Sequence, residues 1–146
     1  MTQKILAIGT ASMRKLIYFT FVGGVGFLVD ASILTLLSQY YDFNIYLSRL
    51  VSFSSATMAT WVLNRKIVFR QEVDPDRSKS EEYARYLLVQ TTGGGVNLLI
   101  FTLFIMVAPS LKSQPIIPLV VGAIFGLAIN FTGTRYWVYS KKVLHV

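Results

Sequence analysis

The sequence lacks cysteine and is poor in charge, with only 14% charged residues in a chain of 146. The absence of cysteine excludes disulfide bonds, thiolate nucleophiles and cysteine-ligated metals. The one histidine, His145, stands next to the C-terminal residue. No metal-ligand cluster, nucleophile–base spacing or phosphate-binding glycine loop is visible. We therefore expect no enzymatic activity, no metal and no cofactor.

Charge this sparse cannot cover the surface of a soluble domain, and hydrophobic residues make up 53% of the chain. A bilayer core of about 30 Å needs roughly 20 apolar residues in a helix, and four windows meet that requirement. Lipid-exposed backbone must satisfy its hydrogen bonds within its own segment, which favours helices. A soluble helical bundle is disfavoured because the third window has no charged face. We predict an all-α, polytopic membrane protein with four transmembrane helices, within residues 16–41, 43–63, 86–111 and 113–134.

Basic residues flank these windows, and the net charge is +7. Three precede the first window, six lie in or beside the central loop and three follow the last window, against Arg49 and Lys112 on the opposite side. The excess predicts that the N- and C-termini and the central loop are cytoplasmic. Basic residues at span ends suit anionic membrane lipids rather than nucleic acid. The flanking residues are Lys4, Arg14, Lys15, Arg65, Lys66, Arg70, Arg77, Lys79, Arg85, Arg135, Lys141 and Lys142.

The two halves of the chain resemble each other, as copies of one unit of about 55 residues. At an offset of 70 residues Arg65 aligns with Arg135, and at an offset of 67 Gly26 aligns with Gly93. Each repeat enters and leaves on the same side, so we predict parallel repeats related by an axis along the membrane normal. We expect a single transmembrane domain over residues 1–146, divided into a first repeat at about 14–70, a cytoplasmic loop at 71–82 and a second repeat at about 83–140.

The central loop, residues 71–82, is the one hydrophilic stretch. The Asp-Pro-Asp sequence at 74–76 is a turn signal. Ser78 followed by Glu81 fits a capping box, which predicts that the third helix begins here, before it enters the membrane. Paired acids in the loop invite a catalytic interpretation, but we favour a solvated linker that leads into a helix.

Two charged residues lie inside predicted spans, Asp30 in the first and Arg49 in the second. A charge within a membrane costs a few kcal/mol and usually faces a partner or a polar cavity. The second repeat has Asn97 where the first has Asp30, and it lacks a counterpart of Arg49, so acid and base are absent together. Two interpretations stay open, with equal weight: a buried ion pair that fixes the first hairpin, or an intramembrane polar site on a substrate path formed by Asp30, Arg49 and Asn97.

Each repeat ends in a basic and aromatic tail that suits the level of the lipid head groups. Arg65, Lys66, Arg70 and Arg135 offer hydrogen-bond donors to phosphate. Positive-inside topology with an aromatic belt would also explain such tails. Their repetition favours a role in binding, with Arg65 and Arg135 converging on one anionic head group. The expected interfacial aromatic residues are Trp61, Phe69, Tyr136, Trp137 and Tyr139.

These stretches resemble the GtrA-like membrane proteins over nearly the whole chain, from Arg14 to about Lys141. The resemblance rests on F-T-F-V-G-G-V-G-F-L-V-D at 19–30, S-R-L-V-S-F at 48–53, and the doubled tail, N-R-K-I-V-F and T-R-Y-W-V-Y. The family's tail pattern is roughly N-x-x-x-N-R-x-x-V-F. The chain keeps Asn64 in the first copy and Asn130 in the second, but has Thr60 and Thr134 at the other asparagine positions.

The resemblance implies a four-helix protein of the bacterial inner membrane with a role in cell-surface polysaccharide synthesis. It implies flipping of a polyprenyl-phosphate-linked sugar, such as undecaprenyl-phosphate-hexose. The lipid phosphate would be bound by Arg65, Lys66, Arg135, Asn64 and Asn130. Four helices are few to enclose a path, so we expect a homo-oligomer. The alternative is a non-catalytic membrane scaffold that recruits a membrane glycosyltransferase.

Overall fold

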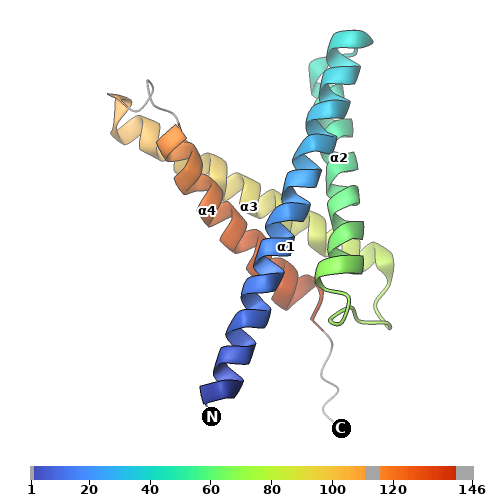
Figure 1. Cartoon of the computed structure of the whole chain (residues 1–146). Coiled ribbons are helices and arrows are strands. Elements are labelled where there is room, and N and C mark those ends of the chain that lie inside the picture. The colour runs from blue at the N-terminus through green and yellow to red at the C-terminus, as the bar shows by residue number, and fades with distance from the viewer. Residues whose placement is uncertain (1, 111–115, 141–146) are drawn as a thin grey trace. The chain divides into compact units, whose positions relative to one another are not determined.

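The computed structural model describes residues 2–110 and 116–140, and these residues form helices and turns without a strand. The all-helical prediction is confirmed. The chain forms α1 (Thr2–Thr35), which continues into a π-helical turn, η1 (Leu36–Tyr40). A second helix, α2 (Ile45–Leu63), continues into η2 (Asn64–Val68). After the central loop come α3 (Lys79–Val107), α4 (Ile116–Gly133) and a last π-helical turn, η4 (Thr134–Val138) (Figure 1).

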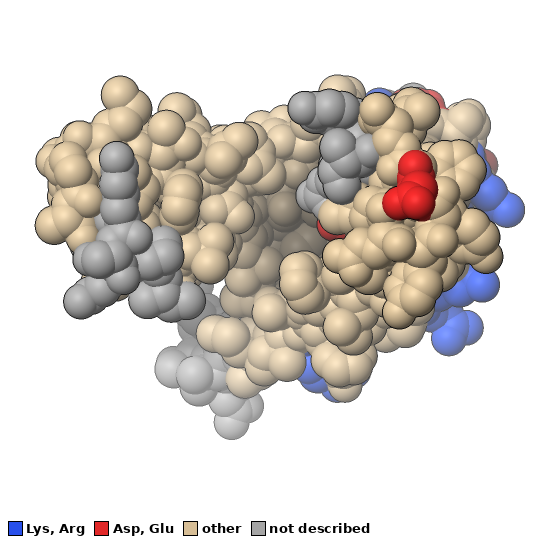
Figure 2. Space-filling view, turned by 90° about the horizontal axis from the view of Figure 1, so that it is seen from above, with Lys and Arg blue, Asp and Glu red and all other residues tan. Residues whose placement is uncertain are grey.

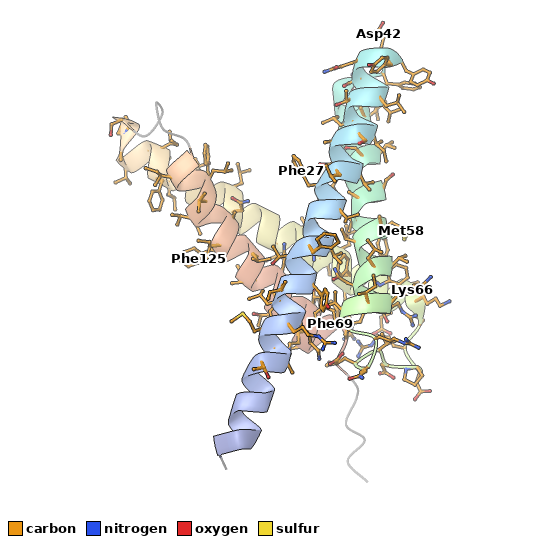
Figure 3. The ribbon with its side chains drawn as sticks, viewed as in Figure 1. Phe27, Asp42, Met58, Lys66, Phe69 and Phe125 are labelled. Carbon is orange, nitrogen blue, oxygen red and sulfur yellow. The ribbon has the colours of Figure 1, made fainter. Side chains whose placement is uncertain are left out.

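Within the described residues, three helices are long and apolar enough to cross a membrane, Thr10–Tyr40, Lys79–Val107 and Ile117–Val138. Large apolar side chains such as Phe27 and Phe125 point outward from them (Figure 3). Uncharged residues dominate the face seen in Figure 2, where Lys and Arg show only toward the rim. These features identify a membrane protein. α2 is not among the three, so a fourth span and the cytoplasmic placement of the termini stay predictions.

The chain divides into two compact units, Met1–Val73 and Asp74–Val146, here called unit 1 and unit 2. In unit 1, α1 packs against α2 and η2, and in unit 2, α3 packs against α4 and η4. The turn of unit 1 lies between the first two predicted windows: Asp42 has a φ of 50°, a left-handed conformation that a short polar side chain tolerates. Asn44 Oδ1 then accepts a hydrogen bond of 3.3 Å from the Leu47 amide at the start of α2. Most of the corresponding segment of unit 2, residues 111–115, lies outside the described residues.

In each unit the two helices approach each other most closely at positions that align between the repeats. A Cβ added to Gly26 would overlap the Cγ2 atom of Thr60, and one added to Gly93 would overlap the Oδ1 atom of Asn130. Gly26 aligns with Gly93, and Thr60 aligns with Asn130 in the doubled tail. In both units the absence of a side chain on the first helix lets the second approach closely. The internal alignment read from the sequence therefore matches the packing of each unit.

Both units also end in the same backbone feature. The Phe69 amide donates to the Asn64 carbonyl across 2.8 Å, and the Tyr139 amide donates to the Thr134 carbonyl across 3.0 Å. Each bond spans five residues, which defines a π-turn, a feature that occurs at helix C-termini. The wider turn shifts the side chains that follow it, and Phe69 and Tyr139 are fully buried.

Burial corrects part of the predicted aromatic belt. Phe69, Tyr139 and Trp61 are buried, so their rings do not face lipid head groups. The Phe69 ring, labelled in Figure 3, packs edge-on against Phe19, with ring centroids 6.1 Å apart. Of the expected interfacial aromatics, Tyr136 and Trp137 are exposed.

Candidate functional site

In unit 1, three of the predicted phosphate ligands occupy consecutive positions of η2. The Asn64 side chain is buried within the unit, Arg65 is half-buried, and Lys66 is exposed and points away from the helix pair (Figure 3). Successive residues of a helical turn face different directions, so these three do not present one surface. Arg65 and Lys66 are the two that a ligand outside unit 1 can reach.

In unit 2, Arg135 is half-buried at the second position of η4. Its guanidinium carbon lies 5.1 Å from the centroid of the Tyr136 ring and 6.0 Å from that of Phe131. Both distances fit cation–π contacts, which hold the charge beside the end of the helix. Asn130 lies one turn earlier on α4, with its Oδ1 atom buried against Gly93.

The predicted intramembrane polar residues lie in both units. Asp30 is half-buried on α1. The side chain of Arg49 lies outside the described part of the structure, so its pairing with Asp30 stays a prediction. Asn97, on α3, faces α4: its Oδ1 atom lies 2.5 Å, and its carbonyl oxygen 2.7 Å, from the position of a Cβ on Gly122. Asn97 therefore belongs to the contact between the two helices of unit 2.

The structure brings the predicted residues together in two groups. Asn64, Arg65 and Lys66 gather at η2 of unit 1, while Asn130 and Arg135 lie one turn apart at the end of unit 2. Convergence of Arg65 and Arg135 on one head group stays a prediction.

The central loop departs from the expected solvated linker, because Asp74, Arg77 and Glu82 are buried. The predicted helix start is confirmed: Ser78 Oγ accepts a hydrogen bond of 3.2 Å from the Glu81 amide. The Asp-Pro-Asp turn is present as well, with the Asp76 amide donating to Asp74 Oδ1 across 3.1 Å. The turn and the helix start were therefore predicted from local patterns, whereas the composition of the loop did not indicate that its charged residues are buried.

Arg77 is the residue of the loop that sequence reasoning missed. Its guanidinium donates to the carbonyl of Val138, to that of Ser140 across 3.0 Å and to that of Trp137 across 3.5 Å. Carbonyls at a helix C-terminus have no partner within the helix, and a cation is favourable there. Asp74 Oδ2 lies 3.8 Å from the same guanidinium. Arg77 thus closes the end of unit 2, and only its place just before a helix cap hinted at such a role.

A cavity of about 550 Å³ lies at the corresponding end of unit 1. It is bordered by the part of α1 from Thr10 to Tyr18 and by residues 67–72, and its lining includes Arg14, Lys15 and Arg70. The Lys15 ammonium group forms an ion pair with Glu72 Oε1. The guanidinium carbon of Arg14 lies 5.8 Å from the Tyr18 ring centroid. The sequence analysis had used Arg14 and Lys15 only to orient the chain in the membrane, and had counted Arg70 among the tail residues that offer donors to phosphate.

Two comparisons with known proteins bear on this architecture. A family model described as the GtrA/DPMS transmembrane domain matches residues 18–139. The chain belongs to this family. The match runs from α1 to the end of η4, so it covers both π-turns, and the resemblance read from the sequence is confirmed. The search of curated proteins returned no match. Membership in the GtrA/DPMS family connects this membrane protein with lipid-linked sugars.

Among the described residues of this GtrA/DPMS domain, no group of three or more His, Cys, Asp or Glu side chains could hold a metal ion. The predicted ligands among the described residues at the ends of the two units offer guanidinium, ammonium and amide groups. These groups bind phosphate and hydroxyl oxygens by hydrogen bonds.

Proposed function

We propose that this GtrA/DPMS domain translocates a polyprenyl-phosphate-linked sugar across the bacterial inner membrane, for cell-surface polysaccharide or glycan modification. The observation that supports the proposal is the repeated end of the two units. Each ends in a π-turn whose second residue is an arginine, Arg65 in η2 and Arg135 in η4. A guanidinium group at a helix end can bind a phosphodiester through two parallel hydrogen bonds.

In this proposal Arg65, Lys66 and Arg135 bind the lipid phosphate, while Asn64 and Asn130 support the two helix ends from inside. The sugar passes the polar residues Asp30, Arg49 and Asn97, which we assign to an intramembrane path. No covalent bond changes, so the proposal requires neither an enzymatic step nor a cofactor. Anionic lipids surround the basic ends, and a homo-oligomer encloses the path, because a single copy offers few helices for it.

Transport by the purified protein tests the proposal. In proteoliposomes that contain only this protein, a labelled polyprenyl-phosphate-hexose should cross the bilayer faster than in empty liposomes. A hydrogen bond to a charged group contributes about 1.5–3 kcal/mol, so Arg65→Gln and Arg135→Gln should each slow transport by at least about tenfold. Lys79→Gln, which removes an exposed charge at the start of α3, should keep the wild-type rate. Wild-type rates in both arginine variants would sink the site assignment.

A membrane scaffold that recruits a glycosyltransferase is the second candidate. It is favoured by the large apolar side chains that α1, α3 and α4 expose, because another helical membrane protein can pack against them. Replacing Asp30 and Arg49 together by leucine separates the two functions. A scaffold should tolerate the apolar pair, since a buried ion pair can often be replaced without loss of stability. A translocase should lose transport while the protein still inserts and folds.

A further inference from the structure

The cavity at the end of unit 1 has a basic wall. Lys15 is paired with Glu72, which leaves the guanidinium groups of Arg14 and Arg70 as the excess positive charge among the residues that line it. Both arginines are exposed. Its volume of about 550 Å³ lies within the usual range for small-molecule sites, roughly 300–1,000 Å³. Two guanidinium groups on the wall of one cavity can share a phosphate group.

The same place in unit 2 is filled by the chain itself. At the offset of 70 residues, Ile67, Val68 and Arg70 of the cavity wall correspond to Trp137, Val138 and Ser140. Those three residues of unit 2 are the ones whose carbonyls accept hydrogen bonds from the Arg77 side chain. The cavity is therefore not a packing defect common to both repeats. It is a difference between two otherwise similar ends.

The cavity lies beside the start of the first predicted membrane-spanning window. That window begins at residue 16, and Arg14 and Lys15, which directly precede it, line the cavity. Basic residues at the end of a span lie at the level of the lipid head groups. Arg14 therefore occupies a position that a head group can reach while its acyl chains stay in the bilayer.

We propose that this cavity binds a phosphate ester, held by Arg14 and Arg70, with Lys15 fixed in place by Glu72. Its lining includes neither Arg65 nor Lys66, so the site is separate from the transport residues proposed above. The inference does not rest on the translocase proposal. Either can fail while the other holds, because the experiment below measures binding and not transport.

Binding of short-chain lipids to the purified full-length protein in detergent, measured by native mass spectrometry and by titration calorimetry, tests the site. Dioctanoyl phosphatidate should bind, and dioctanoylglycerol, which has the same chains without phosphate, should not. Arg14→Gln combined with Arg70→Gln should weaken phosphatidate binding by at least about tenfold. Lys79→Gln, at an exposed position outside the cavity, should stay within about twofold of wild type. Equal binding of dioctanoylglycerol, or unchanged binding by the double variant, would overturn the proposal.

Binding of glycerol 3-phosphate, measured in the same way, distinguishes a soluble phosphate ester from a lipid head group as the occupant of the cavity. If it binds as tightly as phosphatidate and is lost in the double variant, the occupant is a soluble phosphate ester. If only phosphatidate binds, the occupant is a lipid head group. Both results support a phosphate site that depends on Arg14 and Arg70.

Filling the cavity with a side chain distinguishes binding inside the cavity from a general attraction of anionic lipids to a basic protein. Ala11 lines the cavity, and Ala11→Trp would fill it while every charge stays in place. Binding should then fall about as far as in the double arginine variant. Ala84→Trp makes the same change at an exposed position of α3 and should bind like wild type. Wild-type binding by a folded Ala11→Trp protein would show that no cavity is involved and would contradict the proposal.

Discussion

The two units end in the same backbone conformation but differ in the side chains that surround it. Both end in a π-turn at aligned positions, η2 and η4, and in both units an aromatic residue follows the turn and is fully buried. In unit 2, Arg77 donates to the carbonyls at the end of η4. In unit 1 the corresponding residues border an open cavity with Arg14 and Arg70 on its wall. The comparison shows that a duplicated helix pair can keep its backbone while one copy closes its end with an arginine and the other leaves a cavity there.

The difference follows from where the first helix of each unit begins. In unit 2, Ser78 caps α3 at Lys79, so the residues before it form a turn that places Arg77 against η4. In unit 1, α1 is continuous from Thr2, and the position that aligns with Arg77 is Thr10, within the helix. A residue inside a helix cannot fold back in this way. The earlier start of α1 therefore leaves the end of unit 1 open.

Removing the closing residue should produce the largest change in stability. Arg77→Ala leaves the carbonyl of the buried Val138 bond, two part-buried carbonyls and Asp74 without their cation. Loss of one partner of a buried charged network costs about 3–5 kcal/mol. We expect that loss in the free energy of unfolding, measured by denaturant titration in detergent micelles.

Arg85→Ala is the matched control for this change. Arg85 is only partly buried. It contacts the same helix end through one 3.4 Å hydrogen bond to the Trp137 carbonyl and through its guanidinium carbon, which lies 5.6 Å from the centroid of the Trp137 ring. Its loss should cost less than about 1 kcal/mol. Equal losses for the two arginines would contradict the role given to Arg77.

The next largest change in stability is expected at the positions where the two helices of each unit cross. Gly93→Ala places a methyl group against Asn130 and 2.8 Å from the Gly126 carbonyl oxygen, which is backbone and cannot rotate away. Overpacking of this kind costs about 1–3 kcal/mol. Gly26→Ala meets chiefly the side chain of Thr60, so we expect a smaller loss, near the lower end of that range. The same denaturant titrations measure both changes.

A third glycine checks that the loss comes from the crossing and not from the helix itself. Gly94 has open space where its Cβ would lie. Gly94→Ala should therefore raise stability, by up to about 1 kcal/mol, because alanine favours a helix over glycine. A loss at Gly94 as large as at Gly93 would exclude close packing as the cause.

Local patterns in the sequence predicted much of this fold. Hydrophobic windows indicated the helices, the Ser78 and Glu81 pair indicated the start of α3, and the internal alignment anticipated that Gly26 and Gly93 occupy matching crossings. These features depend on neighbouring residues or on a repeated pattern, so a single sequence contains them.

The ends of the units could not be predicted in the same way. Whether Arg77 meets solvent or the carbonyls of residues about 60 positions away depends on tertiary structure. The same holds for the burial of Phe69 and Tyr139, because a π-turn changes which side of the helix the next residues face. Nor does composition indicate that Arg14 and Arg70, far apart in the sequence, border one cavity.

The smallest expected effect concerns one hydroxyl group inside unit 2. Thr134 aligns with Asn64, is fully buried, and its Oγ1 atom has no hydrogen-bond partner among the described residues. A buried polar group without a partner reduces stability, so Thr134→Val, of nearly the same shape, should raise the free energy of unfolding by about 1 kcal/mol. Thr132→Val, at an exposed position of α4, should leave it almost unchanged. If Thr134→Val instead lowers stability, the hydroxyl has a partner in the membrane, and position 134 resembles its asparagine counterpart more closely than the packing of unit 2 indicates.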